Sequence, residues 1–248
     1  MIIDYPNETA GLRQLWKEAF GDSDAFLNLF FTRGYSPRRC RCITEGNAVA
    51  AALYWFDCSF SGKKIAYLYA VATALSHRGQ GLCRKLMADT HALLARQGYA
   101  GAILVPGEES LFDFYAAMGY QSIPCADTIR CTPANTPVPV TALSADAYAT
   151  LRRQLLPKKG VLQEGENLTF LAEICTLYGG DGWVMAASAE GNTLTAMEFL
   201  GDTAPIPGIL AALNMAHGTF RIPGEAPFAM YLPFDGGDAP SYFGLAFD

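Results

Sequence analysis

Residues 67–86, YLYAVATALSHRGQGLCRKL, are the most informative segment of this chain. An apolar run typical of a buried strand ends near Thr73, a polar turn follows, and Gly79 and Gly81 open a helix. The first turn of a helix leaves backbone N–H groups unpaired and carries partial positive charge. Glycine lets a phosphate approach the backbone closely, and Arg78 adds a cation. The stretch therefore predicts an anion site; an ordinary strand–turn–helix is the alternative.

The spacing of this turn separates it from two common nucleotide loops. RGQGLC, residues 78–83, differs from the dinucleotide fingerprint Gly-x-Gly-x-x-Gly, and it lacks the Gly-Lys-Ser/Thr of a nucleoside triphosphate loop. A second segment, FDFYAAMGY at 112–120, lies downstream. Together the two segments resemble the pyrophosphate loop and the Tyr-x-x-x-Gly-Phe/Tyr element of the GNAT acyltransferase superfamily, which binds acetyl-CoA. LWKEAFGDS near the N-terminus and AVAT before the loop resemble its clostridial-type members.

The resemblance covers residues 1–131 and implies a mixed-sheet α/β fold with a GNAT domain over 1–133. It implies that the strand ending at residues 71–73 separates from its neighbour at 100–105, so that backbone groups in the gap hold the pantetheine arm. An amide of that strand would polarise the thioester carbonyl. The cofactor-binding residues that it implies are Val71, Ala72, Thr73, Arg78, Gly79, Gln80, Gly81, Leu82, Cys83 and Arg84.

Four residues are candidates for catalysis, with Glu108 and Glu109 as alternatives for one role. The resemblance implies that Tyr115 protonates the leaving thiolate; the alternative is a core aromatic on a short helix. Glu108 stands where many family members have Asn, so it or Glu109 is a candidate base for the incoming amine, although a solvated loop carboxylate explains either. In some related enzymes the terminal carboxylate is a base, which makes Asp248 a hypothesis. The small loop position is Cys83, which we expect to be a buried, unreactive thiol.

Composition excludes several classes of protein. Hydrophobic residues make up 51% of the 248 residues, which is enough for a core, and no apolar run is long enough to span a bilayer. The net charge of −6 argues against nucleic-acid binding. The seven cysteines are irregularly spaced and no secretory signal precedes them, so we expect reduced thiols in a cytoplasmic protein without a metal site.

A Pro-rich segment, TPANTPVP at 132–139, reads as a domain linker. Beyond it, residues 140–248 show neither family motif and form a second, shorter domain. The length fits a degenerate GNAT-like domain or a sterol-carrier-like one, and two opening helices favour the first. Residues 137–248 carry 5 Lys/Arg against 12 Asp/Glu, a net −7 that suits a cationic acceptor or simply solubility.

Hydrophobic periodicity and turn residues predict the elements. We expect helices at 9–20, 24–32, 81–97, 111–118, 144–156, 167–178 and 206–216, and strands at 40–45, 48–56, 65–73, 100–105, 121–131, 183–189, 193–200, 227–233 and 241–247.

These observations predict an N-acetyltransferase. It would move the acetyl group of acetyl-CoA to a primary amine of a small molecule, polycationic acceptors included, by direct attack in a ternary complex. The alternative is a non-catalytic acyl-CoA sensor or scaffold. We expect no nucleic-acid or membrane partner; the acceptor, the acyl chain length and the oligomeric state stay open.

Overall fold

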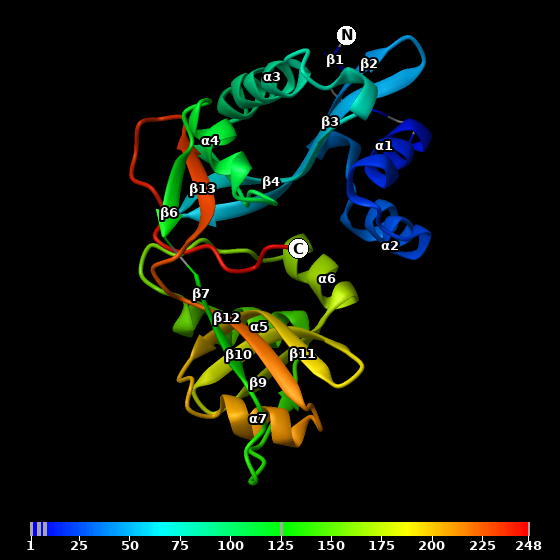
Figure 1. The fold of residues 1–248 in the computed structure, drawn as a ribbon. Helices are drawn as coiled ribbons and strands as arrows, with labels where there is room; N and C mark the ends of the chain where they lie inside the picture. The colour runs from blue at the N-terminus through cyan, green and yellow to red at the C-terminus, as the bar shows by residue number, and fades with distance from the viewer. Residues whose placement is uncertain (1, 4–5, 7–8, 125, 248) are drawn as a thin grey trace. The chain divides into compact units, whose positions relative to one another are not determined.

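The computed structural model of the chain describes residues 2–3, 6, 9–124 and 126–247. The chain forms two compact units, each with its own mixed sheet and helices, which confirms the predicted fold class (Figure 1). The first unit combines Met1–Gln121 with Met230–Ala239, and the second combines Ser122–Ala229 with Pro240–Asp248.

The first unit is built on a seven-stranded sheet in the order β1-β2-β3-β4-β5-β13-β6. β4 and β5 run parallel, whereas β13 is antiparallel to β5. Its strands are β1 (Ile2–Ile3), β2 (Cys40–Glu45), β3 (Ala48–Phe60), β4 (Lys63–Thr73), β5 (Gly101–Leu104), β6 (Gln121–Pro124) and β13 (Pro227–Pro233).

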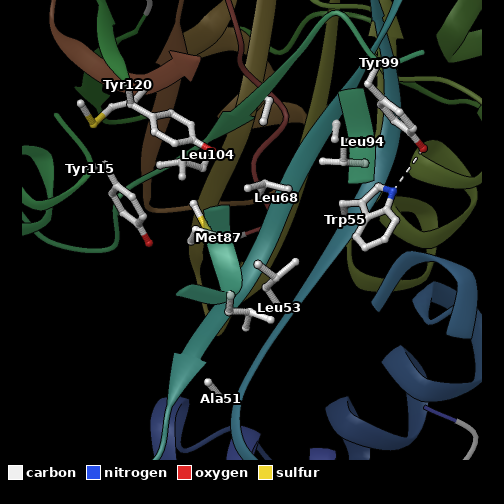
Figure 2. Packing of buried hydrophobic residues seen from close by; sticks show 14 of the residues in the cluster. Ala51, Leu53, Trp55, Leu68, Met87, Leu94, Tyr99, Leu104, Tyr115 and Tyr120 are labelled. Carbon is white, nitrogen blue, oxygen red and sulfur yellow. Dashed lines mark hydrogen bonds between the residues drawn. The ribbon is translucent and has the colours of Figure 1, made fainter. Parts of the chain in front are cut away.

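Helices cover both faces of this sheet. They are α1 (Ala10–Phe20), α2 (Asp24–Leu29), α3 (Leu82–Arg96) and α4 (Ser110–Ala116), with a π-helical turn at Phe30–Gly34 and 3-10 turns at Pro37–Arg39 and Leu75–His77. Alternation along β3 divides the core, because successive strand residues face opposite sides. Leu53 and Trp55 pack with α3 and α4 residues, as Figure 2 shows. Tyr54 faces the other side, where its ring lies 5.2 Å from Trp16 of α1.

The second unit has a six-stranded sheet in the order β7-β12-β11-β10-β9-β8. Here β11 and β12 are the parallel pair, and β7 is antiparallel to β12. The strands are β7 (Asp127–Cys131), β8 (Thr141–Ala142), β9 (Thr176–Gly180), β10 (Trp183–Glu190), β11 (Thr193–Gly201) and β12 (His217–Ile222). The helices are α5 (Ala145–Leu155), α6 (Glu166–Ile174) and α7 (Ile206–Ala212).

The two sheets share one plan. Each has an antiparallel run, then one parallel pair, then an antiparallel strand beside that pair. That last strand does not follow its neighbours in sequence. β13, from late in the chain, completes the first sheet, and β7, from directly after β6, completes the second. The two units therefore exchange equivalent strands.

A buried charge network ties the second unit together. Glu198 of β11 is fully buried and accepts hydrogen bonds from Arg152 of α5 through Nε at 2.6 Å and NH2 at 2.9 Å. The hydroxyls of Tyr148 and Tyr242 donate to the same carboxylate at 3.1 and 3.0 Å. Four hydrogen bonds satisfy the oxygens of a charge that would otherwise be costly to bury.

The domain boundary expected between residues 133 and 140 is not where the units divide. The Pro-rich segment lies along α7 instead, because Ala134 N–H donates to the Pro207 carbonyl at 2.9 Å and Val138 N–H donates to the Gly208 carbonyl at 3.2 Å. Val138 also packs against the core of the second unit. The Pro-rich composition correctly indicated a segment without regular structure at 132–139. Hydrogen bonds and packing nevertheless hold this segment within the second unit.

Three predicted elements also differ, and one strand was not predicted. The strand expected at 121–131 is two strands, β6 and β7, in different sheets. The helix expected at 167–178 ends at Ile174, because residues 176–180 pair with β10 as β9. Residues 217–220 were assigned to no element, but they pair with β11 as part of β12. The strand expected at 241–247 is a single bridge between Tyr242 and Gly160, although its side chains are buried.

Candidate functional site

A bulge in β4 shapes the end of the strand that precedes the glycine turn. Ala70 has a φ of +49°, and the pairing with β3 shifts register between Ala52 and Tyr54. A bulge adds one residue, so side chains beyond it change face. Before the bulge Leu68 packs with the α3 side of the core; beyond it, Val71 does.

The two parallel strands separate next to this bulge. Pairing between β4 and β5 is confined to Ala66 with Ala102 and Tyr67 with Ile103, while β4 continues to Thr73. On its other side β4 stays paired with β3 through Ala72 and Thr73. The separation predicted for residues 71–73 is therefore present. The edge of that segment that is not paired with β3 is not paired with β5 either.

The glycine turn leads directly into α3. Gly79 and Gly81 have φ values of +76° and +75°, and Gly81 caps the helix. A Cβ built on either glycine would meet nothing within 4 Å, and both residues are exposed. Lys85 N–H donates to the Gly81 carbonyl at 3.0 Å, so the amides before Lys85 in the first turn are without intrahelical acceptors. This is an open, positively polarised helix end on a 15-residue helix.

Polar groups at the end of β4 complete the turn. Arg78 folds back, and its Nε donates to the Thr73 carbonyl at 3.3 Å. The Thr73 hydroxyl oxygen is buried and has no hydrogen-bond partner among the described residues. An orphaned hydroxyl beside an open helix end is the pattern of a site that a polar ligand completes. Arg84 lies over the ring of Phe114 in α4, 5.5 Å from its centroid, which brings α4 beside the turn.

Tyr115 lies in the core cluster that α3 and α4 share with the sheet. Its ring is 7% exposed and lies 5.8 Å from that of Tyr120. Its hydroxyl points away from Tyr120 in Figure 2, and no hydrogen bond to it is found within the described part of the chain. Burial, and then the nearby Cys83, raise the pKa of the Tyr115 hydroxyl, which keeps it protonated at neutral pH. The structure thus places a protonated hydroxyl near the turn.

Cys83 is partly buried, whereas we expected a buried thiol. It packs against the same cluster, and burial raises the pKa of its thiol to about 11. A thiol attacks as the thiolate, so this environment disfavours a nucleophilic role.

His91 of α3 contacts Tyr120 and Phe234 at the core cluster of the first unit. Its Nε2 lies 2.8 Å from the Tyr120 hydroxyl, and its ring lies 5.6 Å from Phe234. Burial lowers the pKa of His91 to about 4, so the ring is neutral at physiological pH.

The carboxylate candidates have different surroundings. Glu108 is exposed directly before α4 and accepts a hydrogen bond from Ser110 Oγ at 2.6 Å. Glu109 is the exposed N-terminal flank of the same helix. Asp248 lies outside the described residues. The structure therefore brings together the turn and Tyr115, whereas Glu108 and Glu109 are solvent-facing residues of the α4 loop.

The second unit repeats the bulge but not the turn. β11 shifts register against β10 at Ala186/Ala187, and its parallel pairing with β12 ends at Ala196. After β11, however, the Asp202 side chain accepts a hydrogen bond from Ala204 N–H at 3.0 Å. A carboxylate of the chain therefore takes an amide that a phosphate would need. The following α7 has only seven residues and begins at buried Ile206.

The strand–bulge–turn–helix arrangement agrees with the comparisons with known proteins. A family model described as "Acetyltransferase (GNAT) domain" matches residues 6–123. The chain therefore contains a GNAT domain over these residues. A search of curated proteins finds no match.

Solved structures with the GNAT fold extend over both units. The GCN5-related N-acetyltransferase from Kribbella flavida aligns with a TM-score of 0.72 at 14% identity, covering 95% of this chain and 71% of its own. The one from Anabaena variabilis aligns with a TM-score of 0.71 at 14% identity over 93% and 72%. The one from Sphaerobacter thermophilus covers 98% of both chains at 12% identity, with a TM-score of 0.56. At these identities the likeness concerns the fold.

The GNAT domain supports an acyltransferase function for this chain. The shared sheet plan favours the GNAT-like interpretation of the second unit over the sterol-carrier-like one. The clostridial-type subtype stays a prediction. None of the helices described is long and apolar enough to cross a membrane. Within the same residues no group of three or more His, Cys, Asp or Glu side chains could hold a metal ion.

Proposed function

We propose that this GNAT chain transfers an acetyl group from acetyl-CoA to a primary amine of a small molecule. The observation that carries the proposal is the open end of α3, where Gly79 and Gly81 expose polarised amides beside the separated end of β4. The residues fit the group: the amides and Arg78 suit a pyrophosphate, and the unpaired edge of residues 71–73 suits an extended amide-bearing arm.

In this proposal the turn holds the pyrophosphate through the backbone amides of residues 79–84, with Arg78 fixing the turn against the Thr73 carbonyl. The free edge of β4 pairs with the pantetheine arm, and an amide of Val71 or Thr73 polarises the thioester carbonyl. Bound acetyl-CoA supplies an activated acyl carbon with a good leaving group.

The chemistry then requires little acid–base assistance. The amine lone pair attacks the carbonyl carbon, a C–N bond forms, the C–S bond breaks, and the sulfur leaves with the bonding electrons. The Tyr115 hydroxyl, protonated because of burial and free of hydrogen bonds to described residues, donates its proton to that sulfur. The amine loses a proton to a base, for which Glu108, Glu109 and Asp248 remain candidates. The acidic composition of residues 137–248 suits a cationic acceptor.

Calorimetric titration of acetyl-CoA into the wild type and a Gly81→Glu variant tests the binding step. A side chain at φ +75° is strained and its carboxylate would repel the pyrophosphate, so we expect the micromolar affinity of the wild type to fall at least 100-fold. Gly98→Glu is the matched control, because Gly98 has a φ of +81° and open surroundings at the other end of α3. Equal losses in both variants, or no binding to the wild type, would refute the placement.

Release of free thiol in the presence of a panel of amines tests turnover. Tyr115→Phe keeps the buried ring, so we expect kcat to fall by 10- to 1000-fold while acetyl-CoA affinity stays within threefold. Binding without turnover on any amine would favour the alternative function, a non-catalytic acyl-CoA sensor.

A further inference from the structure

A pocket lies at the end of the first unit's sheet that is remote from the glycine turn. Its volume is about 820 Å³, which is in the range of small-molecule sites. It is lined by the segment Ser36–Arg39 and by Asp57, Lys64, Gln97 and Tyr99. Along β4, Lys64 and Thr73 are separated by nine residue steps, roughly 30 Å at ~3.3 Å per residue. The pocket is thus separate from the proposed acetyl-CoA site.

The walls of this pocket are cationic in an acidic chain. Arg38 is exposed and Arg39 is half-buried, and both follow each other in the 3-10 turn before β2. Among the described residues that line the pocket, three are cationic, Arg38, Arg39 and Lys64, and one is acidic, Asp57. The chain as a whole has a net charge of −6, so this concentration of positive charge is a local feature.

Side-chain contacts hold the wall opposite the arginines. Asp57 accepts hydrogen bonds from the Tyr99 hydroxyl at 2.5 Å and forms an ion pair with Lys64 at 2.9 Å. The Lys64 ammonium also lies 4.3 Å from the centroid of the Tyr99 ring. Trp55 Nε1 donates to the Tyr99 hydroxyl at 3.2 Å from within the core, the contact drawn as a dashed line in Figure 2. The wall is therefore fixed before any ligand arrives.

We infer that this pocket binds a small multivalent anion, such as a phosphorylated or polycarboxylate metabolite, between Arg38–Arg39 and the Lys64 wall. The guanidinium groups are suited to bidentate contacts with phosphate or carboxylate oxygens. The carboxyl end of α3 adds partial negative charge near Gln97, so the anion sits on the arginine side. The inference is independent of the proposed acyl transfer.

The three tryptophans give a direct test. Trp55 contacts a residue of the pocket wall, whereas Trp16 and Trp183 lie elsewhere. Inorganic pyrophosphate and, separately, citrate are titrated into ¹⁵N-labelled protein at low salt while the indole N–H resonances are recorded, with Trp55 assigned by Trp55→Phe. We expect a saturable shift confined to the Trp55 resonance, and the preferred anion tells phosphate from carboxylate chemistry.

Matched variants make the test specific. Arg38→Gln/Arg39→Gln should weaken binding at least tenfold, and Arg38→Gln alone, at an exposed side chain, by about threefold. Arg96→Gln removes the same charge from an exposed α3 residue that does not line the pocket, and should bind like the wild type. Gly81→Glu should also retain the Trp55 shift, which separates this site from the acetyl-CoA site. No saturable Trp55 shift with either anion, or equal affinity in the double variant, would overturn the inference.

Discussion

The buried network around Glu198 makes a prediction about stability. Glu198→Gln should destabilise the wild type but stabilise the Arg152→Met variant. In the wild type, Glu198→Gln removes the charge that Arg152 faces and leaves a buried guanidinium uncompensated. Breaking one side of a buried ion pair costs about 3–5 kcal/mol, and Arg152→Met should cost as much because the carboxylate is then uncompensated. In the Arg152→Met background, however, Glu198→Gln should be stabilising, because it removes that buried charge. Tyr148 and Tyr242 donate to different oxygens of Glu198, so the amide oxygen of the glutamine can accept from one hydroxyl while its NH2 group donates to the oxygen of the other.

Urea unfolding of the four proteins in the cycle measures this coupling. The indole resonance of Trp183, stacked on Phe199 with centroids 5.6 Å apart, reports the second unit, and that of Trp16 reports the first. Each single variant should lower the urea midpoint of the second unit by about 2 M, given an m-value of about 2 kcal/mol/M. This prediction would be refuted if Arg152→Met lowered the free energy of unfolding by less than about 1 kcal/mol, or if Glu198→Gln were destabilising in both backgrounds. Either result would show that the Arg152–Glu198 pair does not compensate the burial of the two charges.

Three further predictions concern the first unit. Burial lowers the pKa of His91 to about 4, whereas an unfolded histidine has a pKa of about 6.5. The free energy of unfolding should therefore fall by roughly 3 kcal/mol as the pH falls from 6.5 to 4. Urea titrations of His91→Gln should show a smaller fall over the same pH range. Gly101→Ala places a Cβ 2.3 Å from the Tyr231 hydroxyl on β13 and should lower stability by about 1–3 kcal/mol in urea, whereas Gly107→Ala, with nothing within 4 Å, should be near neutral. Since the pKa of Cys83 is raised to about 11, iodoacetamide at pH 7.5 should label it far more slowly than a model thiol by mass spectrometry, and Cys83→Ala should retain acetyl-CoA binding; rapid labelling would contradict this.

Local signals were sufficient for the turn and its neighbours. The sequence predicted a strand ending at Thr73 and a helix over 81–97, and the structure has β4 ending there and α3 over Leu82–Arg96. Glycines with positive φ and an amphipathic helix leave marks within a few residues, so this part of the site could be read directly. The bulge at Ala70 left no such mark, because alanine is uncommon at positive φ.

Long-range pairing explains what could not be predicted. The alternating apolar residues of 241–247 suggested a strand, but they are buried as an irregular segment held by contacts such as Gln163 Nε2 to the Leu245 carbonyl at 2.5 Å. Residues 176–178 were predicted as the end of a helix, but they form part of β9 because β10 lies beside them. The cationic pocket was missed since its residues come from separate segments of the chain, each unremarkable alone.

The strand exchange has a consequence for how the chain reaches its fold during synthesis. Vectorial folding lets an N-terminal domain form before the rest of a protein has left the ribosome. Here the gap between β5 and β6 stays open until Pro227–Pro233 has been made, although the family motifs end about a hundred residues earlier. Until then two strand edges are available for wrong partners, on a nascent chain or on another molecule. A fragment cut after the recognisable GNAT segment would inherit that defect permanently, so the smallest self-sufficient piece of this protein extends well into its second half.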